Sequence, residues 1–243
     1  MKKVLLIVSV FILNILIYSA CSKSIEEISG DLNFEEIDDI GRVHNQALDY
    51  LSNNVDVNTA SKEIYFNTIK EYLMTISLGN TKDEISKMDL NTCNCDKKYY
   101  SIETWITENK PKLIEEKYLL RYSKVLQKAD NSNTLWDEVK KIETDIINDS
   151  DRNLNKSKLL GFSSILRNSS IYWQNVYEDE KHPFHLKMMS HQANKSGWPI
   201  DTYALIDALS YYDCLEHGQF GSYDTATSTC LGQATYSSAR AFN

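Results

Sequence analysis

The chain has 243 residues and is acidic, with 34 Asp and Glu against 26 Lys and Arg and a net charge of −8. An acidic surface repels phosphate, which argues against nucleic acid as a partner and against recruitment to anionic lipid by charge alone. With only 8 glycines and 3 prolines, the chain does not fit a β-sandwich built on many tight turns.

The first segment has the order of an export signal. Two lysines precede an apolar run, Val4–Tyr18, and small residues then lead into Cys21. A cysteine at the cleavage point of such a signal is typical of bacterial lipoproteins, in which this cysteine is acylated. We therefore expect a lipoprotein signal peptide over residues 1–20, lipid on Cys21 and an acidic tether over residues 21–32.

Alternatives remain open for this segment. Tyr18 stands where ordinary secretion signals prefer a small residue and where lipoprotein signals prefer leucine. An uncleaved transmembrane helix requires about 20 apolar residues, and Asn14 interrupts this run. We expect a lipid-anchored protein of the bacterial cell envelope, in the outer membrane because Ser22 and not aspartate follows Cys21. The alternative is secretion to the periplasm.

The rest of the chain is predicted to be all-α. Apolar residues recur at intervals of three and four, and no segment alternates with period two. Asn33 can cap the first helix, and Glu36 can reach back to the cap. We expect one bundle-like domain, residues 33–243, with about seven helices and mostly antiparallel neighbours. The expected helices cover residues 33–51, 58–78, 111–125, 134–146, 156–176, 199–217 and 224–239.

Three stretches lie between these helices. Residues 101–108, around Trp105, are a further short helix candidate. Residues 81–100 are expected to be loop with a short helical turn, because they are mostly polar. Residues 178–199 form the longest stretch without helical periodicity.

Four cysteines remain if Cys21 is acylated, an even number in an exported chain. A bond between Cys93 and Cys95 would close a very tight ring, which disulfide geometry disfavours. We expect each of these two to pair with one of Cys214 and Cys230. The alternatives are a single 214–230 bridge or four free buried cysteines. The small residues of the last helix suit the inner hairpin of a bundle, with Cys214 on one arm and Cys230 on the other.

The segment 178–191 is the best candidate for a metal centre. It holds His182, His185 and His191 just after three acidic residues. Imidazoles and carboxylates are zinc ligands, and a catalytic zinc needs three protein ligands and one open position. However, the spacing matches no zinc signature, and Pro183 disfavours a helical pair of ligands. We expect a solvated loop without metal or other cofactor, and the alternative is a metal-dependent hydrolase that uses these histidines.

Two weaker candidates have simpler explanations. His44 lies on the apolar stripe of the first helix, where a histidine bonded within the core is expected more often than a general base. Residues 149–155 alternate oxygen-bearing side chains like a calcium loop. Leu154 and Leu160, however, stand where such a loop needs glycine and glutamate.

Gly41–Asn45 and Leu48–Tyr50 form a G-x-x-H-N-x-x-L-D-Y run. This run resembles one found near the acylated cysteine in a group of uncharacterised lipoproteins from Gram-negative bacteria. Asp207–Ala241 is similar to their C-terminal helical hairpin of small residues, although it has fewer glycines. The resemblance implies an envelope location and brings no activity with it.

From these features we expect a membrane-anchored, non-catalytic binding or scaffold protein, with no catalytic residue assigned. Its partners would be the membrane, through the lipid on Cys21, and an envelope protein or glycan. Such a protein exposes aromatic or apolar side chains, for which 15 tyrosines and 4 tryptophans give material. A third possibility is a spacer or assembly element that self-associates.

Overall fold

The computed structural model of the chain describes residues 34–77, 79–89, 99–192, 199–218, 220 and 223–241. Within these residues every regular element is an α-helix, and there are ten of them. They are α2 (Phe34–Asn54), α3 (Lys62–Ile76), α4 (Gly79–Ser86), α5 (Ile102–Asn109), α6 (Leu113–Leu126), α7 (Ser132–Asn148), α8 (Lys156–Glu178), α9 (His185–Gln192), α10 (Pro199–His217) and α11 (Tyr223–Ala239).

The all-α prediction is confirmed, whereas the expected number of about seven helices is too low for the described residues. The difference comes from short elements. Both α4 and α9 have 8 residues, too few for an apolar period to show in the sequence. The third, α5, coincides with the short helix proposed around Trp105.

Several helices begin just after a residue whose side-chain oxygen accepts a hydrogen bond from a backbone N–H group of the first turn. Such N–H groups have no partner within the helix. The Asn131 side chain accepts from Thr134 N at 2.9 Å, so α7 begins earlier than the expected start at residue 134. Ser61 takes this role for α3, later than the predicted start near Asn58. Asn155 does so for α8, which places the start of this helix as predicted.

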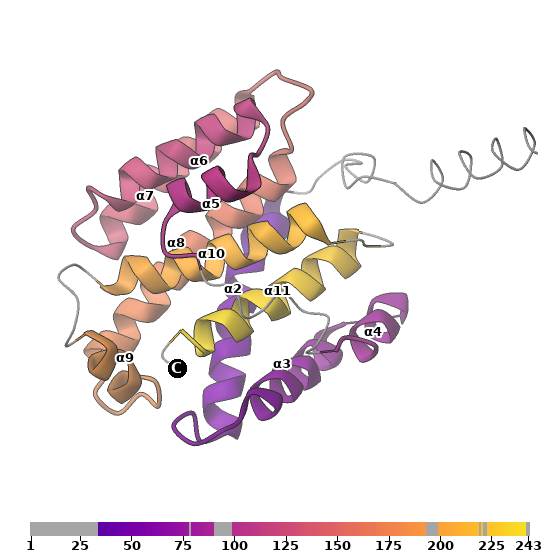
Figure 1. The fold of residues 1–243 in the computed structure, drawn as a ribbon, viewed down its shortest axis with the longest axis vertical. Coiled ribbons are helices and arrows are strands. Elements are labelled where there is room, and N and C mark those ends of the chain that lie inside the picture. The colour runs from indigo at the N-terminus through magenta and orange to yellow at the C-terminus, as the bar shows by residue number, and fades with distance from the viewer. Residues whose placement is uncertain are drawn as a thin grey trace, which may run out of the picture. The chain divides into compact units, whose positions relative to one another are not determined.

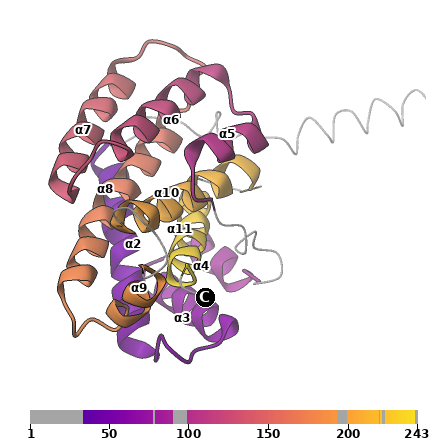
Figure 2. The same cartoon turned by 60° about the vertical axis from the view of Figure 1, so that its left-hand side comes forward.

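The long helix α8 organises the packing. It contacts α2, α7 and α10, and α11 lies along α10 and against α2, α3 and α4 (Figure 1). Helices α5, α6 and α7 pack on one another in sequence and form a layer on one side of α8 (Figure 2). The polar residues of α8, α10 and α11 are therefore largely enclosed by other helices.

Aromatic rings join the α5–α7 layer to this centre. The Trp105 ring of α5 meets the Tyr212 ring of α10 edge-on, with centroids 5.1 Å apart. Tyr212 packs likewise on Phe162 of α8 at 5.9 Å, and Phe162 lies 5.0 Å from Tyr122 of α6. Edge-to-face contacts of this kind stabilise beyond the apolar area that they bury.

The disulfide corrects the sequence interpretation. It joins Cys214 of α10 to Cys230 of α11, with Cα atoms 5.3 Å apart. The expected pairing of these two with Cys93 and Cys95 is therefore wrong, and the alternative of a 214–230 bridge is the pairing found. The reason is that α10 and α11 form an antiparallel hairpin, which brings the two arms within bonding range without a distant loop (Figure 1). Cys93 and Cys95 lie outside the described residues.

In the part of the chain that the structure describes, no helix combines the length and the hydrophobicity that a membrane span requires. The expected signal peptide over residues 1–20, the lipidation site Cys21 and the tether over residues 21–32 lie outside the described residues.

Candidate functional site

The face of α2 that packs on α8 includes residues of the stretch from Gly41 to Leu48 that was noted in the sequence. A Cβ at Gly41 would lie 2.2 Å from the Ser164 carbonyl oxygen, so only glycine fits without a backbone shift. One turn later, Asn45 Nδ2 donates to the Asn168 carbonyl at 2.9 Å. Leu48 is fully buried beyond it. This part of the motif therefore encodes close approach of two helices.

His44 lies in the same face and is completely buried. Its Nδ1 is 3.2 Å from Ser169 Oγ of α8 and 3.2 Å from Asn45 Oδ1. Its Nε2 is 3.8 Å from Asp207 Oδ2 of α10, and both side chains have 0% exposure. The expectation of a histidine bonded within the core is thus met, and its partner is a buried carboxylate from a distant part of the chain.

Asp207 is held by groups from three helices. Trp173 Nε1 of α8 donates to Oδ2 at 3.0 Å. Ser169 of α8 and Ser238 of α11 lie close enough to influence the carboxylate, but Asp207 Oδ1, Ser238 Oγ and His44 Nε2 each lack a hydrogen bond of good geometry. Burial raises the pKa of Asp207, while the His44 imidazole and these neighbouring groups oppose the rise. We name Ser169, His44, Trp173, Asp207 and Ser238 the buried polar cluster.

The order Ser169, His44, Asp207 has the residue types of a serine hydrolase relay. Two features set it apart. The 3.8 Å between Nε2 and Oδ2 is longer than a hydrogen bond, and Ser169 has 0% exposure in the middle of α8. A nucleophile must reach a substrate carbonyl, which an enclosed hydroxyl does not. What this arrangement does is connect four helices through polar contacts in their centre.

The histidines proposed as metal ligands are placed apart from this cluster. His185 begins α9 and is nearly buried, with Nδ1 3.0 Å from the Val176 carbonyl at the end of α8. His182 Nδ1 accepts from Phe184 N at 3.2 Å, and its ring packs edge-on against Tyr172. The His191 side chain is not among those described. Among the described residues, no group of three His, Cys, Asp or Glu could hold a metal ion.

The expected solvated loop is found over residues 179–183, but the expectation is wrong from His185 onward. Residues from His185 onward form α9, which packs on the end of α8 and buries Phe184 and Met188. The two apolar side chains lie four residues apart, one helical turn, and this spacing was the available signal. Burial lowers the pKa of His182, against the raising effect of Asp49 and Asp179.

Sequence reasoning missed two buried cations on α8. Arg167 has 1% side-chain exposure; its Nε donates to Glu143 Oε1 of α7 at 2.8 Å, and its guanidinium pairs with Asp38 of α2. Lys158 Nζ lies 2.7 Å from Glu115 Oε2 of α6. The available signal was Glu143, which stands between apolar positions on the inner face of α7.

No family model matches the chain, and comparison with curated proteins and with solved structures gives no significant match either. The resemblance to Gram-negative lipoproteins stays a prediction.

Proposed function

We propose that this chain is a lipid-anchored, non-catalytic binding or scaffold protein of the bacterial cell envelope. Acylated Cys21 would hold it in the outer membrane, and its helices would act as one bundle-like body around α8. The location is supported by the order of the N-terminal segment, in which lysines, an apolar run and small residues precede the cysteine.

The observation that carries the non-catalytic part of the proposal is the enclosure of the buried polar cluster. Its serine, histidine and aspartate are the residue types of acid–base and nucleophilic catalysis, yet all three have 0% exposure. Buried polar groups bonded to one another specify which helix faces meet. A structural role explains these residues without a substrate.

The binding part is supported by apolar side chains on the surface where α8 and α9 meet. Tyr177 at the end of α8 is 40% exposed, and Leu186 and Met189 of α9 are 70% and 39% exposed. The bond from His185 to Val176 joins the residues next to Tyr177 and Leu186. Exposed aromatic and large apolar residues are enriched where proteins bind partners.

Intact-mass spectrometry of the protein from its native membrane fraction, with metal analysis of the same sample, tests the anchor and the alternative together. We expect a chain that begins at acylated Cys21, a reducible bond between Cys214 and Cys230, and no stoichiometric zinc. A mass without acyl groups would contradict the anchor. Stoichiometric zinc would instead favour a hydrolase that uses His182, His185 and His191.

A photo-crosslinking amino acid at Leu186 tests the binding role in intact cells. The matched control carries the same group at Lys82, an exposed position on α4. We expect a discrete crosslinked species from position 186 alone. Crosslinks only to a second copy of the chain would support the assembly-element alternative, and no crosslink from position 186 would contradict a partner at this surface.

A further inference from the structure

We propose that the outer face of α6 docks on the anionic phospholipid headgroups of the bilayer that holds the protein's own anchor. This inference rests on the proposed lipid anchor at Cys21 and adds the orientation of the folded part to it. It also refines the conclusion drawn from net charge, because a chain of −8 can still carry a local basic surface.

The segment made up of α6 and its flanking residues is opposite in charge to the whole chain. Residues 110–128 contain six Lys and Arg but only two Glu. One of these, Glu115, is buried against Lys158 and so contributes little to the surface. The outer side of this helix is therefore basic in a protein that is acidic overall.

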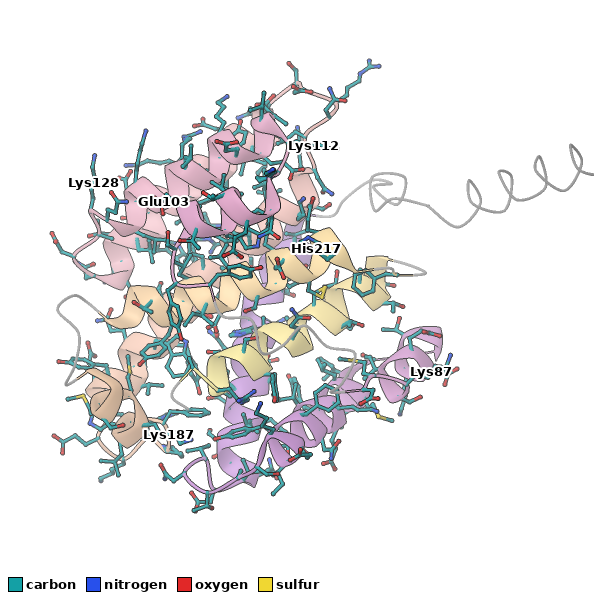
Figure 3. All side chains as sticks on the ribbon, in the orientation of Figure 1. Lys87, Glu103, Lys112, Lys128, Lys187 and His217 are labelled. Atoms are coloured by element: carbon teal, nitrogen blue, oxygen red, sulfur yellow. A yellow bond between two sulfur atoms is a disulfide. The ribbon has the colours of Figure 1, made fainter. Side chains whose placement is uncertain are left out.

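The cations share one side of the helix. Lys117, Arg121, Lys124 and Lys128 are spaced by four, three and four residues, which keeps them within one helical face and its continuation. Leu113, four residues before Lys117, is on the same face and is 84% exposed, the highest value among the exposed large hydrophobic side chains described. Figure 3 labels Lys128 at one end of α6 and Lys112 at the other.

Two of the four cations on this face, Lys124 and Lys128, differ in pairing from other lysines on the surface, whereas Arg121 lies 2.5 Å from Asp145 of α7. Lys87 lies 2.7 Å from Glu84, and Lys140 lies 3.0 Å from Glu143. In the described part of the chain, neither Lys124 nor Lys128 has a carboxylate within ion-pair distance, and both are exposed. Unpaired cations beside an exposed leucine suit headgroup phosphates with the acyl region just below them.

The start of the folded part lies on the same layer. Asp38, in the second turn of α2, is 3.2 Å from Lys140 of α7, and α7 packs on α6. From Cys21 to Asn33 there are 13 residues, which span at most about 45 Å when fully extended. The anchor would thus confine the folded part to within about 45 Å of the bilayer and raise the frequency with which α6 meets it, and the attraction itself acts over a Debye length of about 8 Å.

The test uses the mature lipoprotein, purified with its acyl groups and reconstituted into two kinds of vesicle. One contains phosphatidylcholine alone and the other contains one part in three of phosphatidylglycerol. Brief acetylation followed by peptide mass spectrometry reports the reactivity of each lysine. We expect Lys124 and Lys128 to react about threefold more slowly on the anionic vesicles, with the protection lost at high salt. Lys82 on α4 serves as the internal control and should not change.

A charge-reversed variant sharpens the assignment. Lys124→Glu with Lys128→Glu should remove the lipid-dependent protection of Lys117, because the face loses its attraction. Lys82→Glu with Lys87→Glu changes the net charge equally, at one exposed position of α4 and one just after it, and should leave that protection intact. Equal protection of Lys117 in both variants would overturn the docking face.

The same preparation separates this inference from the proposed function. If the intact mass shows acyl groups but Lys124 and Lys128 react equally on both kinds of vesicle, the docking face is wrong and the anchor stands. If the mass shows no acyl group, both proposals are overturned.

Discussion

The two charged centres that pack against α8 differ in how far they are shielded from solvent. At one, Asp207 faces His44 and both side chains have 0% exposure, so no part of the pair reaches water. At the other, Arg167 has 1% exposure, but its partner Asp38 is 50% exposed and also meets Lys140. The first centre is closed on all sides by protein, and the second opens to solvent at the edge of α2.

The difference appears in the direction of the pKa shifts. Burial raises the pKa of Asp207, and the groups around it do not fully compensate. For Asp38, burial also acts to raise the pKa, but the charge of Arg167 and the hydrogen bonds from Arg167 and Lys140 outweigh it and lower the value. Asp207 and Asp38 both contact side chains of α8, yet their pKa values are shifted in opposite directions.

The largest predicted effect separates the two centres. Asp207→Ala removes the acceptor of Trp173 Nε1 and leaves His44 without its partner in the protein interior. We expect a loss of about 3 to 5 kcal/mol in the free energy of unfolding. Asp38→Ala should cost about 1 kcal/mol or less, since Asp38 is half exposed and Arg167 keeps its ion pair with Glu143. Urea unfolding followed by tryptophan fluorescence measures both, and equal losses would contradict the distinction.

The disulfide joins two of the helices that enclose the Asp207 centre, because α10 carries Asp207 and α11 carries Ser238. Replacing Cys214 and Cys230 by alanine frees a loop with a sequence separation of 16 residues. Chain entropy predicts a loss of about 3 kcal/mol for a loop of this size. Thermal unfolding of the double variant, compared with the wild type with and without reductant, checks the value. A reductant effect that persists in the double variant would show that another bond is responsible.

Next in size is the close approach of α2 and α8 beside His44. Gly41→Ala forces a Cβ against the Ser164 backbone, and we expect a loss of about 1 to 3 kcal/mol from overpacking. Gly232→Ala is the matched control, since its Cβ would meet the flexible end of the Leu73 side chain at 2.8 Å. The control should be near neutral in urea unfolding. Equal stability of the two variants would argue against a tight contact at Gly41.

The smallest effect is a pH dependence of opposite sign. The lowered pKa of Asp38 means that its contribution is present above the ordinary value of 3.8 and is lost as pH falls through the folded value. Relative to wild type, Asp38→Asn should therefore be less stable at pH 6, with the gap closing in acid. The raised pKa of Asp207 means that wild type loses stability, relative to Asp207→Asn, as pH rises above 3.8. Urea midpoints between pH 3 and 6 measure both trends. If the stability difference from wild type changed in the same direction with pH for both variants, the opposite pKa shifts of Asp38 and Asp207 would be contradicted.

The sequence predicts those parts of the molecule whose signals are local. The apolar stripe of α2 places His44 in the core, and the change from a polar loop to helical periodicity places the start of α8 at residue 156. The hairpin of small residues puts Cys214 and Cys230 on facing arms, but the choice of pairing needed the distance between those arms. Short helices such as α4 lack enough residues for a period to appear.

The partner of His44 could not be found in this way. Every position of α10 from Tyr203 to Leu215 is buried, so no stripe sets Asp207 apart from its neighbours. The contact also joins residues that are 163 positions apart in the chain, and it depends on how four helices cross. The same holds for Arg167 and Asp38, where a long-range ion pair carries no local sequence pattern.

A double-mutant cycle on His44 and Asp207 tests most directly whether the buried polar cluster is part of the fold. The free energies of unfolding of His44→Ala, Asp207→Ala and the double variant are compared with wild type in urea. We predict that each single variant is strongly destabilised and that the two changes are coupled by at least about 1 kcal/mol. If instead either single variant is as stable as wild type or more stable, as is common for residues retained for activity at a cost in stability, the cluster is not structural and the non-catalytic proposal is contradicted.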